Sequence, residues 1–252
     1  MNLKRSIQKR LCEIRNALGR LLAPHKYSHI VSLGFNCEVA FQFLQHHGNV
    51  ESHLFNWYYS DSTKELIRSL RSLETVGLDF KPSCYMWRDV SYGLAFHGRG
   101  NHDIWDADAA QELLQADKEE LISRIAHLKK KFMSLANKSD SILFVYKPWP
   151  AELSAMEDCV QNIIELQKAL KDIGMKAFHL LIVIPQEHEA SLKDALKIAN
   201  STGIFVESVT HYAPNNNVTG GDCDKKGWQR IWQTYIPKHR LKKTKKKYKF
   251  DS

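Results

Sequence analysis

The chain has 252 residues, of which 43% are apolar and 25% charged, and its formal net charge is +8. This composition is typical of a soluble globular protein and excludes the disordered and fibrous classes. The length allows one full-sized core with extensions. No apolar run approaches the roughly 20 residues that cross a bilayer, and Glu13, Arg15 and Arg20 interrupt any signal-peptide core. We therefore expect a cytoplasmic protein.

The basic residues gather at the two ends of the chain. Residues 1–24 carry a net charge of +5 and residues 237–252 one of +7, which leaves about −4 for residues 25–236. The spacing of Ile7, Leu11 and Ile14 predicts a basic amphipathic helix, and the Lys-rich end predicts a disordered tail. Both ends suit an anionic membrane surface, although the helix can instead dock on the protein's own core and the tail can stay solvated. The acidic body argues against nucleic acid as a partner.

The cysteine and glycine patterns exclude several kinds of site. Five widely spaced cysteines include no C-x-x-C pair, which argues against a zinc ribbon or a redox motif and favours a reducing compartment. Neither a phosphate-binding loop nor a dinucleotide-binding glycine pattern is present, and the chain has no H-E-x-x-H metal motif. We expect no cofactor and no metal.

Between the two ends, short apolar runs alternate with segments of helical periodicity. Residues 85–96 are predicted as extended chain or a hairpin. The other predicted strands are 29–33, 142–146, 178–184 and 204–208, and the predicted helices are 37–46, 62–73, 107–136, 151–172 and 189–200. Near-continuous apolar strands separated by helices indicate a parallel sheet covered on both faces. We predict one α/β domain over residues 25–236, with three layers in a flavodoxin-like or SGNH-like arrangement.

Cys37 is placed where the first strand should lead into a helix. Gly34 and Asn36 supply turn chemistry directly before it. A thiol in the first turn of a helix faces unpaired N–H groups and the positive end of the helix dipole, and both favour the nucleophilic thiolate. Cys37 is therefore a candidate nucleophile. The alternative is a small buried core residue.

The residues that follow the predicted strands should meet at one edge of the sheet, because ligands of open α/β sheets bind beyond the carboxyl ends of the strands. The turn at 34–37 can hold an anion. The polar loop 212–227 is long enough to cover this edge, and the aromatic segment 54–57 is either a wall of the pocket or core. The substrate contacts expected from this reasoning are Gly34, Asn36, Asn56, Trp57, Lys147, Trp149 and Asp222.

A cysteine nucleophile needs a base and a group that orients the base. His97 follows an apolar stretch and has Asp89 eight residues before it. His211 follows the last predicted strand and has Asp222 and Asp224 nearby. The sequence leaves the choice between His97 and His211 open, with His102 and His188 as weaker candidates.

Several of these segments resemble a bacterial family of unknown function that is labelled as papain-like cysteine peptidases. The similarity covers roughly residues 29–235, and its most specific block is Ser32–Ala40, which adds Ser32 to the expected substrate contacts. The looser blocks are Phe55–Trp57, Asp89, Tyr92–Gly93, Phe96–His97, Arg124–Ile125, Ile142–Val145 and Trp228. The resemblance implies Cys37 as nucleophile, His97 as base, Asp89 as orienting group and Trp228 as a further contact. The chain departs from the family at Asn56, where Asp is usual, and after His97, where the family tends to have an acid.

The strand, glycine turn and nucleophile also resemble the first block of SGNH-type esterases and of capsule-biosynthesis acyltransferases. In those enzymes the partner histidine comes late in the chain, which implies His211 as the base. Fold-level analogy is a weak argument, but it agrees with the predicted parallel sheet.

Together these observations favour a cysteine-dependent hydrolase or acyltransferase whose substrate includes a surface saccharide. Backbone N–H groups of the 34–37 turn are the expected oxyanion donors. One alternative is an enzyme of cell-envelope polysaccharide biosynthesis that handles a sugar or nucleotide sugar without a covalent step. Another is a binding module that acts through its basic ends.

Overall fold

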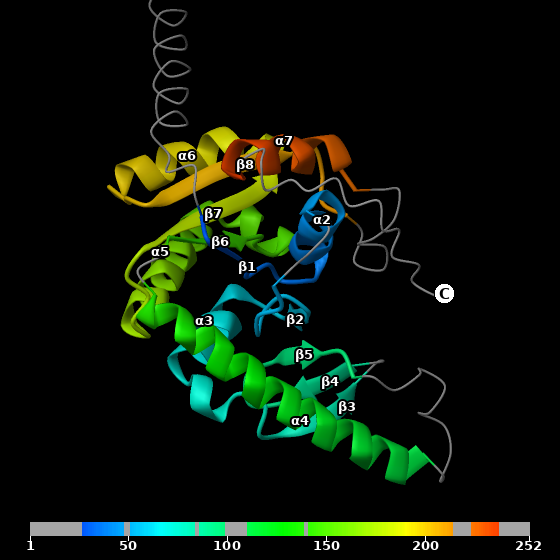
Figure 1. Cartoon of the computed structure of the whole chain (residues 1–252). Coiled ribbons are helices and arrows are strands. Elements are labelled where there is room, and N and C mark those ends of the chain that lie inside the picture. The colour runs from blue at the N-terminus through cyan, green and yellow to red at the C-terminus, as the bar shows by residue number, and fades with distance from the viewer. Residues whose placement is uncertain are drawn as a thin grey trace, which may run out of the picture.

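The computed structural model describes residues 27–47, 51–83, 86–98, 110–138, 141–213 and 223–236. These residues form two four-stranded sheets and the helices that pack on them (Figure 1). The predicted N-terminal helix, the predicted basic tail and Asp222 lie outside the described residues. Among the helices described, none is long and apolar enough to cross a membrane.

The first sheet is parallel, as the sequence predicts. Its strand order is β1-β6-β7-β8, and its strands are β1 (His29–Ser32), β6 (Ile142–Tyr146), β7 (Phe178–Pro185) and β8 (Ile204–Val209). Their bounds differ from the predicted ones by at most one residue. The strands stand side by side in chain order, so the described sheet lacks the reversal of strand order found in flavodoxin-like sheets.

Both faces of the parallel sheet are covered, because its side chains alternate between two apolar clusters. Leu143 and Leu181 pack against α2 (Glu38–His47) and α7 (Lys225–Tyr235). Phe144 and Ile182, one residue further along each strand, pack in the cluster that includes α5 (Met156–Asp172) and α6 (Glu189–Ile198). The α/β class is thus confirmed.

The second sheet is antiparallel and was predicted only as an extended stretch or hairpin. Its order is β2-β5-β4-β3, and its strands are β2 (Tyr58–Ser60), β3 (Phe80–Ser83), β4 (Met86–Asp89) and β5 (Leu94–Phe96). Strands of three or four residues are too short to show a clear period of two, which explains why most of this sheet escapes sequence reasoning.

One helix connects the two sheets along the chain, between β5 and β6, and another lies between β2 and β3 of the antiparallel sheet. In Figure 1, α4 (Ala110–Ser134) runs along the antiparallel sheet, against which it packs Leu121 and Ile125. Helix α3 (Thr63–Arg71) packs against α5. Short 3-10 helices complete the described residues at η1 (Leu73–Thr75), η3 (Leu135–Asn137), η4 (Pro150–Ser154) and η5 (Gln186–His188).

Helix α7 occupies residues that the sequence analysis leaves unassigned or places in a loop. The Asp224 carboxylate accepts a hydrogen bond from the Gly227 N–H (2.8 Å), which caps the first turn. Trp228, Ile231 and Trp232 are buried at spacings of three and four. This spacing is a helical signal that the sequence already contains, although the preceding polar residues obscure it.

Candidate functional site

Cys37 lies at the N-terminus of α2, as predicted. Its carbonyl accepts the first helical hydrogen bond from the Phe41 N–H (3.0 Å), and the Asn36 side-chain oxygen accepts from the Glu38 N–H (3.1 Å). The turn before it is tight at Gly34, where a Cβ would come within 3.1 Å of the Val39 side chain. This close approach explains why glycine suits that position.

His97 is the histidine that meets Cys37. The Cys37 Sγ and the His97 Nε2 are 3.8 Å apart, although the residues are 60 positions apart in the sequence. The antiparallel sheet produces this contact, because β2 pairs Tyr58 with Phe96, the residue before His97. The Tyr58 carbonyl oxygen is the second partner of the thiol, at 3.7 Å. Cys37, Tyr58 and His97 therefore form one cluster between the two sheets.

The thiol of Cys37 is buried, with 6% of the residue exposed. Burial raises the pKa of Cys37 to about 12, and the nearby Lys147 ammonium group and the backbone N–H of Cys37 lower it only in part. The sequence analysis expects the opposite direction from the helix N-terminus. Desolvation of the thiolate outweighs the helix end here, so the resting residue is a protonated thiol.

A buried ion pair lies beside the cluster. The Lys147 ammonium group is paired with the Glu38 carboxylate, and both side chains are fully buried. The same carboxylate accepts hydrogen bonds from the Trp228 indole N–H (2.9 Å) and the Ala213 N–H (3.2 Å). The Lys147 ammonium also lies 4.3 Å from the centre of the Phe35 ring. Glu38 therefore already binds the side chains of Lys147 and Trp228, both of which were predicted as substrate contacts.

Asp89, the predicted orienting group, is held elsewhere. Its carboxylate accepts hydrogen bonds from the Gly77 N–H (2.6 Å) and the Ser91 N–H (3.0 Å). Burial raises the pKa of Asp89, while these backbone donors lower it in part. In the β4–β5 pairing Asp89 stands opposite Leu94, three residues before His97. The carboxylate therefore fixes two turns of the antiparallel sheet.

His211, the alternative base, follows β8 and is exposed. Its Nδ1 lies 2.9 Å from the Thr210 hydroxyl, and the Thr210 N–H donates to Asp224 (2.7 Å). The described hydrogen-bond partners of Cys37 are His97 and Tyr58, not His211.

Segment 51–57 lies along the outer edge of β1. The Ser32 N–H donates to the Asn56 side-chain oxygen (3.3 Å), and the Asn56 amide donates to the Glu51 carbonyl (3.1 Å). Trp57 packs edge-on against Phe41 of α2, with ring centres 4.9 Å apart. The Ser32 N–H, the Asn56 amide and the Trp57 ring therefore have structural partners, whereas the buried Ser32 hydroxyl has no hydrogen-bond partner among the described residues.

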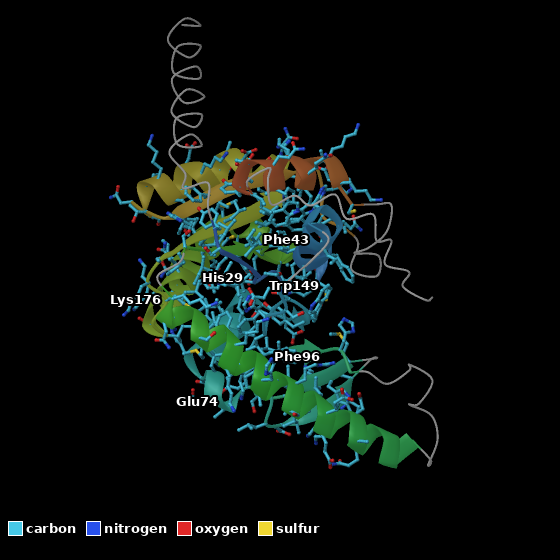
Figure 2. All side chains as sticks on the ribbon, viewed as in Figure 1. His29, Phe43, Glu74, Phe96, Trp149 and Lys176 are labelled. Carbon is cyan, nitrogen blue, oxygen red and sulfur yellow. The ribbon has the colours of Figure 1, made fainter. Side chains whose placement is uncertain are left out.

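Trp149 lies between the two sheets with its side chain partly exposed (Figure 2). Its ring stacks on Phe35 at 4.4 Å, and its indole N–H donates to the Ser60 carbonyl (2.5 Å). Tyr59, also partly exposed, meets the same ring edge-on at 5.4 Å. Phe35, Tyr59 and Trp149 form an aromatic cluster at the carboxyl edge of the parallel sheet.

Sequence reasoning missed three residues at the centre of the site: Glu38, Tyr58 and Phe35. Each lies directly beside a predicted residue, but only the fold shows which partner its side chain or backbone reaches.

One group of side chains in the described residues could hold a metal ion. It consists of His29, Glu51 and His53, and it lies apart from Cys37. Comparisons with family models, with curated proteins and with solved structures found no match for the chain.

Proposed function

We propose that Cys37 and His97 are the nucleophile and the general base of a cysteine-dependent acyl-transfer enzyme. The observation that supports this most directly is the 3.8 Å separation of the Cys37 Sγ and the His97 Nε2. A nucleophile and a base within hydrogen-bonding reach are the minimum arrangement for covalent catalysis. This pairing agrees with the resemblance to the papain-like label and favours His97 over His211.

In the proposed reaction, His97 takes the thiol proton as the sulfur attacks a carbonyl carbon. A thioester forms between the acyl group and Cys37, and the imidazolium returns its proton to the leaving group. Water or a hydroxyl acceptor then attacks the thioester, again with His97 as the base, and the thiol is restored. Hydrolase and acyltransferase differ only in the identity of that acceptor.

The electrostatics of the site favour proton transfer during attack rather than a resting ion pair. Burial raises the pKa of Cys37 to about 12, so a thiolate is not stored in the free enzyme. The Lys147 ammonium attracts negative charge on the sulfur, and the N-terminus of α2 acts in the same direction. Both groups stabilise the charge as it develops, in a site from which the fold excludes most water.

A saccharide is the substrate class that we favour. The partly exposed rings of Tyr59 and Trp149 lie at the carboxyl edge of the parallel sheet, where α/β proteins bind ligands. Flat aromatic rings suit the apolar face of a sugar. We propose that the enzyme transfers an acyl group to or from a surface polysaccharide. We also propose that its sheet and helices follow an SGNH-like arrangement. The basic ends of the chain would hold the enzyme at the inner membrane face.

Acylation by p-nitrophenyl acetate tests the proposal. Acid-quenched protein should carry an acetyl thioester on Cys37, located by mass spectrometry, and Cys37→Ala should remove it. His97→Gln should slow its formation by about 10²–10⁴-fold. Cys159→Ser is the matched control, because Cys159 is also buried with a pKa raised by burial to about 12. If the acetyl thioester formed on Cys37 at the same rate in the wild type and in His97→Gln, His97 would not be the general base.

A second candidate function is sugar binding and conversion without a covalent step, for which the stacked rings of Phe35 and Trp149 are the favouring observation. Cys37 would then be a packing residue. Under this function Cys37→Ser keeps full turnover of the natural saccharide, whereas Trp149→Ala loses saccharide binding.

A further inference from the structure

A second group of chemically reactive side chains lies at the other end of β1 from Cys37. His29 is the first residue of β1 (Figure 2), and Glu51 and His53 lie on the segment along its edge. The His29 Nδ1 is 2.9 Å from the Glu51 Oε2, and the His53 Nε2 is 3.6 Å from the same oxygen. One ligand atom from each residue lies within 4.8 Å of the others.

His53 is the unusual member of this group. Its side chain is fully buried, and within the described part of the chain neither ring nitrogen has a hydrogen-bond partner. The 3.6 Å gap to Glu51 is too long for a hydrogen bond. A buried imidazole without partners is costly, and native proteins rarely leave such groups unsatisfied unless a ligand or ion completes them.

The protonation states of the group suit a cation. Burial lowers the pKa of His53 to about 4 against the attraction of the Glu51 carboxylate. Burial by itself would raise the pKa of Glu51, but the His29 hydrogen bond and the positive charges around it hold that pKa at about 2. At neutral pH the pair is a neutral imidazole and an ionised carboxylate, which are the forms that bind metals.

We propose that His29, Glu51 and His53 form a binding site for a zinc-class transition-metal dication. Two imidazoles and one carboxylate are a known zinc donor set, which leaves a fourth position open. Tetrahedral zinc with ligands at 2.0–2.1 Å separates the ligand atoms by roughly 3.4 Å. The observed 2.9 and 3.6 Å lie on either side of that value. Calcium and magnesium prefer all-oxygen sites and do not suit two histidines.

Two lysines flank the proposed site. The Lys131 ammonium lies 3.4 Å from the Glu51 Oε1, which leaves the Oε2 directed at the histidines. The Lys138 ammonium lies 3.1 Å from the His29 Nε2. A metal on the His29 Nδ1 places the ring proton on Nε2, so the ion must displace Lys138. Both lysines are only partly buried, and their charged ends can turn to water while their stems stay in place.

Zinc titration of the EDTA-treated full-length chain by calorimetry tests the site. We expect one site whose affinity falls at least tenfold in Glu51→Gln and in His53→Leu. It should be unchanged in His127→Gln, which alters an exposed histidine on α4. Lys138→Met should tighten binding several-fold, because it removes the competing charge. At a free zinc concentration about 100 times Kd, the melting temperature of the wild type should rise by about 5–10 °C.

His53→Leu separates metal binding from a packing role. Because the imidazole makes no hydrogen bond, the metal-free variant should melt at or above the wild-type temperature and lose only the zinc-dependent rise. A lowered metal-free melting temperature together with wild-type zinc affinity would overturn the site. The same conclusion would follow from a thiolate charge-transfer band with Co²⁺, which would assign the metal to the cysteines.

Discussion

The Lys147 ammonium group and the Glu38 carboxylate form a fully buried ion pair beside Cys37. Glu38 is the residue after the cysteine, and Lys147 follows β6, so the pair joins the start of α2 to the carboxyl edge of the parallel sheet. The Trp228 indole N–H and the Ala213 N–H also donate hydrogen bonds to the Glu38 carboxylate. The position of Cys37 therefore depends on a charge network that also reaches α7.

Removing one partner of this pair should be strongly destabilising. Lys147→Met leaves a buried, unpaired carboxylate and should lower the free energy of unfolding by about 3–5 kcal/mol in urea titrations. Lys193→Met, which breaks a partly exposed pair with Glu189 one helical turn away, should cost less than about 1 kcal/mol. The double variant Glu38→Gln/Lys147→Met should recover part of the loss, because neither charge of the pair remains. Equal costs for Lys147→Met and Lys193→Met would contradict this account.

Alkylation of Cys37 should show an unactivated thiol in the free protein. Because burial raises the pKa of Cys37 to about 12, the rate with iodoacetamide should rise about tenfold per pH unit from pH 7 to 10 without a plateau. Site-resolved mass spectrometry measures this, with Cys159 as an internal reference for a buried thiol. A plateau below pH 8 at Cys37 would instead show the stored thiolate that its helix position alone suggests.

The parallel sheet and the placement of Cys37 were predictable because local signals determine both. Continuous apolar runs mark β6 and β7, and a glycine turn before a helical pattern marks the start of α2. Such patterns are read within a window of a dozen residues. The position of Cys37 at the helix N-terminus follows directly from them.

The partners of Cys37 were not predictable to the same degree, because they come from non-local pairing. The choice of His97 over His211 depends on the register that sets Tyr58 opposite Phe96, in strands too short to recognise. The pKa of the Cys37 thiol depends on how deeply the fold buries it, which the sequence pattern does not reveal. Asp89 stands near His97 in sequence, but strand register turns its carboxylate towards Gly77.

Asp89→Asn distinguishes an orienting role from a structural one. The carboxylate accepts hydrogen bonds from the Gly77 and Ser91 N–H groups, so we expect a loss of about 1–3 kcal/mol in the free energy of unfolding. The pH profile of Cys37 alkylation should stay as in the wild type. A changed profile in a folded variant would mean that Asp89 acts on the His97–Cys37 pair.

Asn56→Asp should be destabilising, because the carboxylate cannot make both hydrogen bonds of the amide. The Asn56 amide both accepts from the Ser32 N–H and donates to the Glu51 carbonyl, and a carboxylate cannot donate. Facing that carbonyl with an ionised oxygen should cost about 1–3 kcal/mol at neutral pH, measured by thermal or urea unfolding. Asn56→Ser is the control variant, because a serine hydroxyl can donate or accept a hydrogen bond but is shorter than the amide. A variant as stable as the wild type would show that segment 51–57 adjusts freely.

The His53 imidazole should make the metal-free protein acid-sensitive in a defined window. Its folded pKa of about 4 lies below the unfolded value of 6.5, so between these values the unfolded chain binds more protons. Stability from this group is therefore complete above pH 6.5 and is lost as the pH falls to 4, by about 3 kcal/mol. Urea unfolding of the wild type with EDTA should show this fall, and His53→Leu should lack it. The neighbours that also titrate or carry charge, Glu51, His29, Lys131 and Lys138, remain in both proteins, so the difference between the two curves isolates His53. Parallel curves would mean that the imidazole takes up its proton in the folded state without penalty.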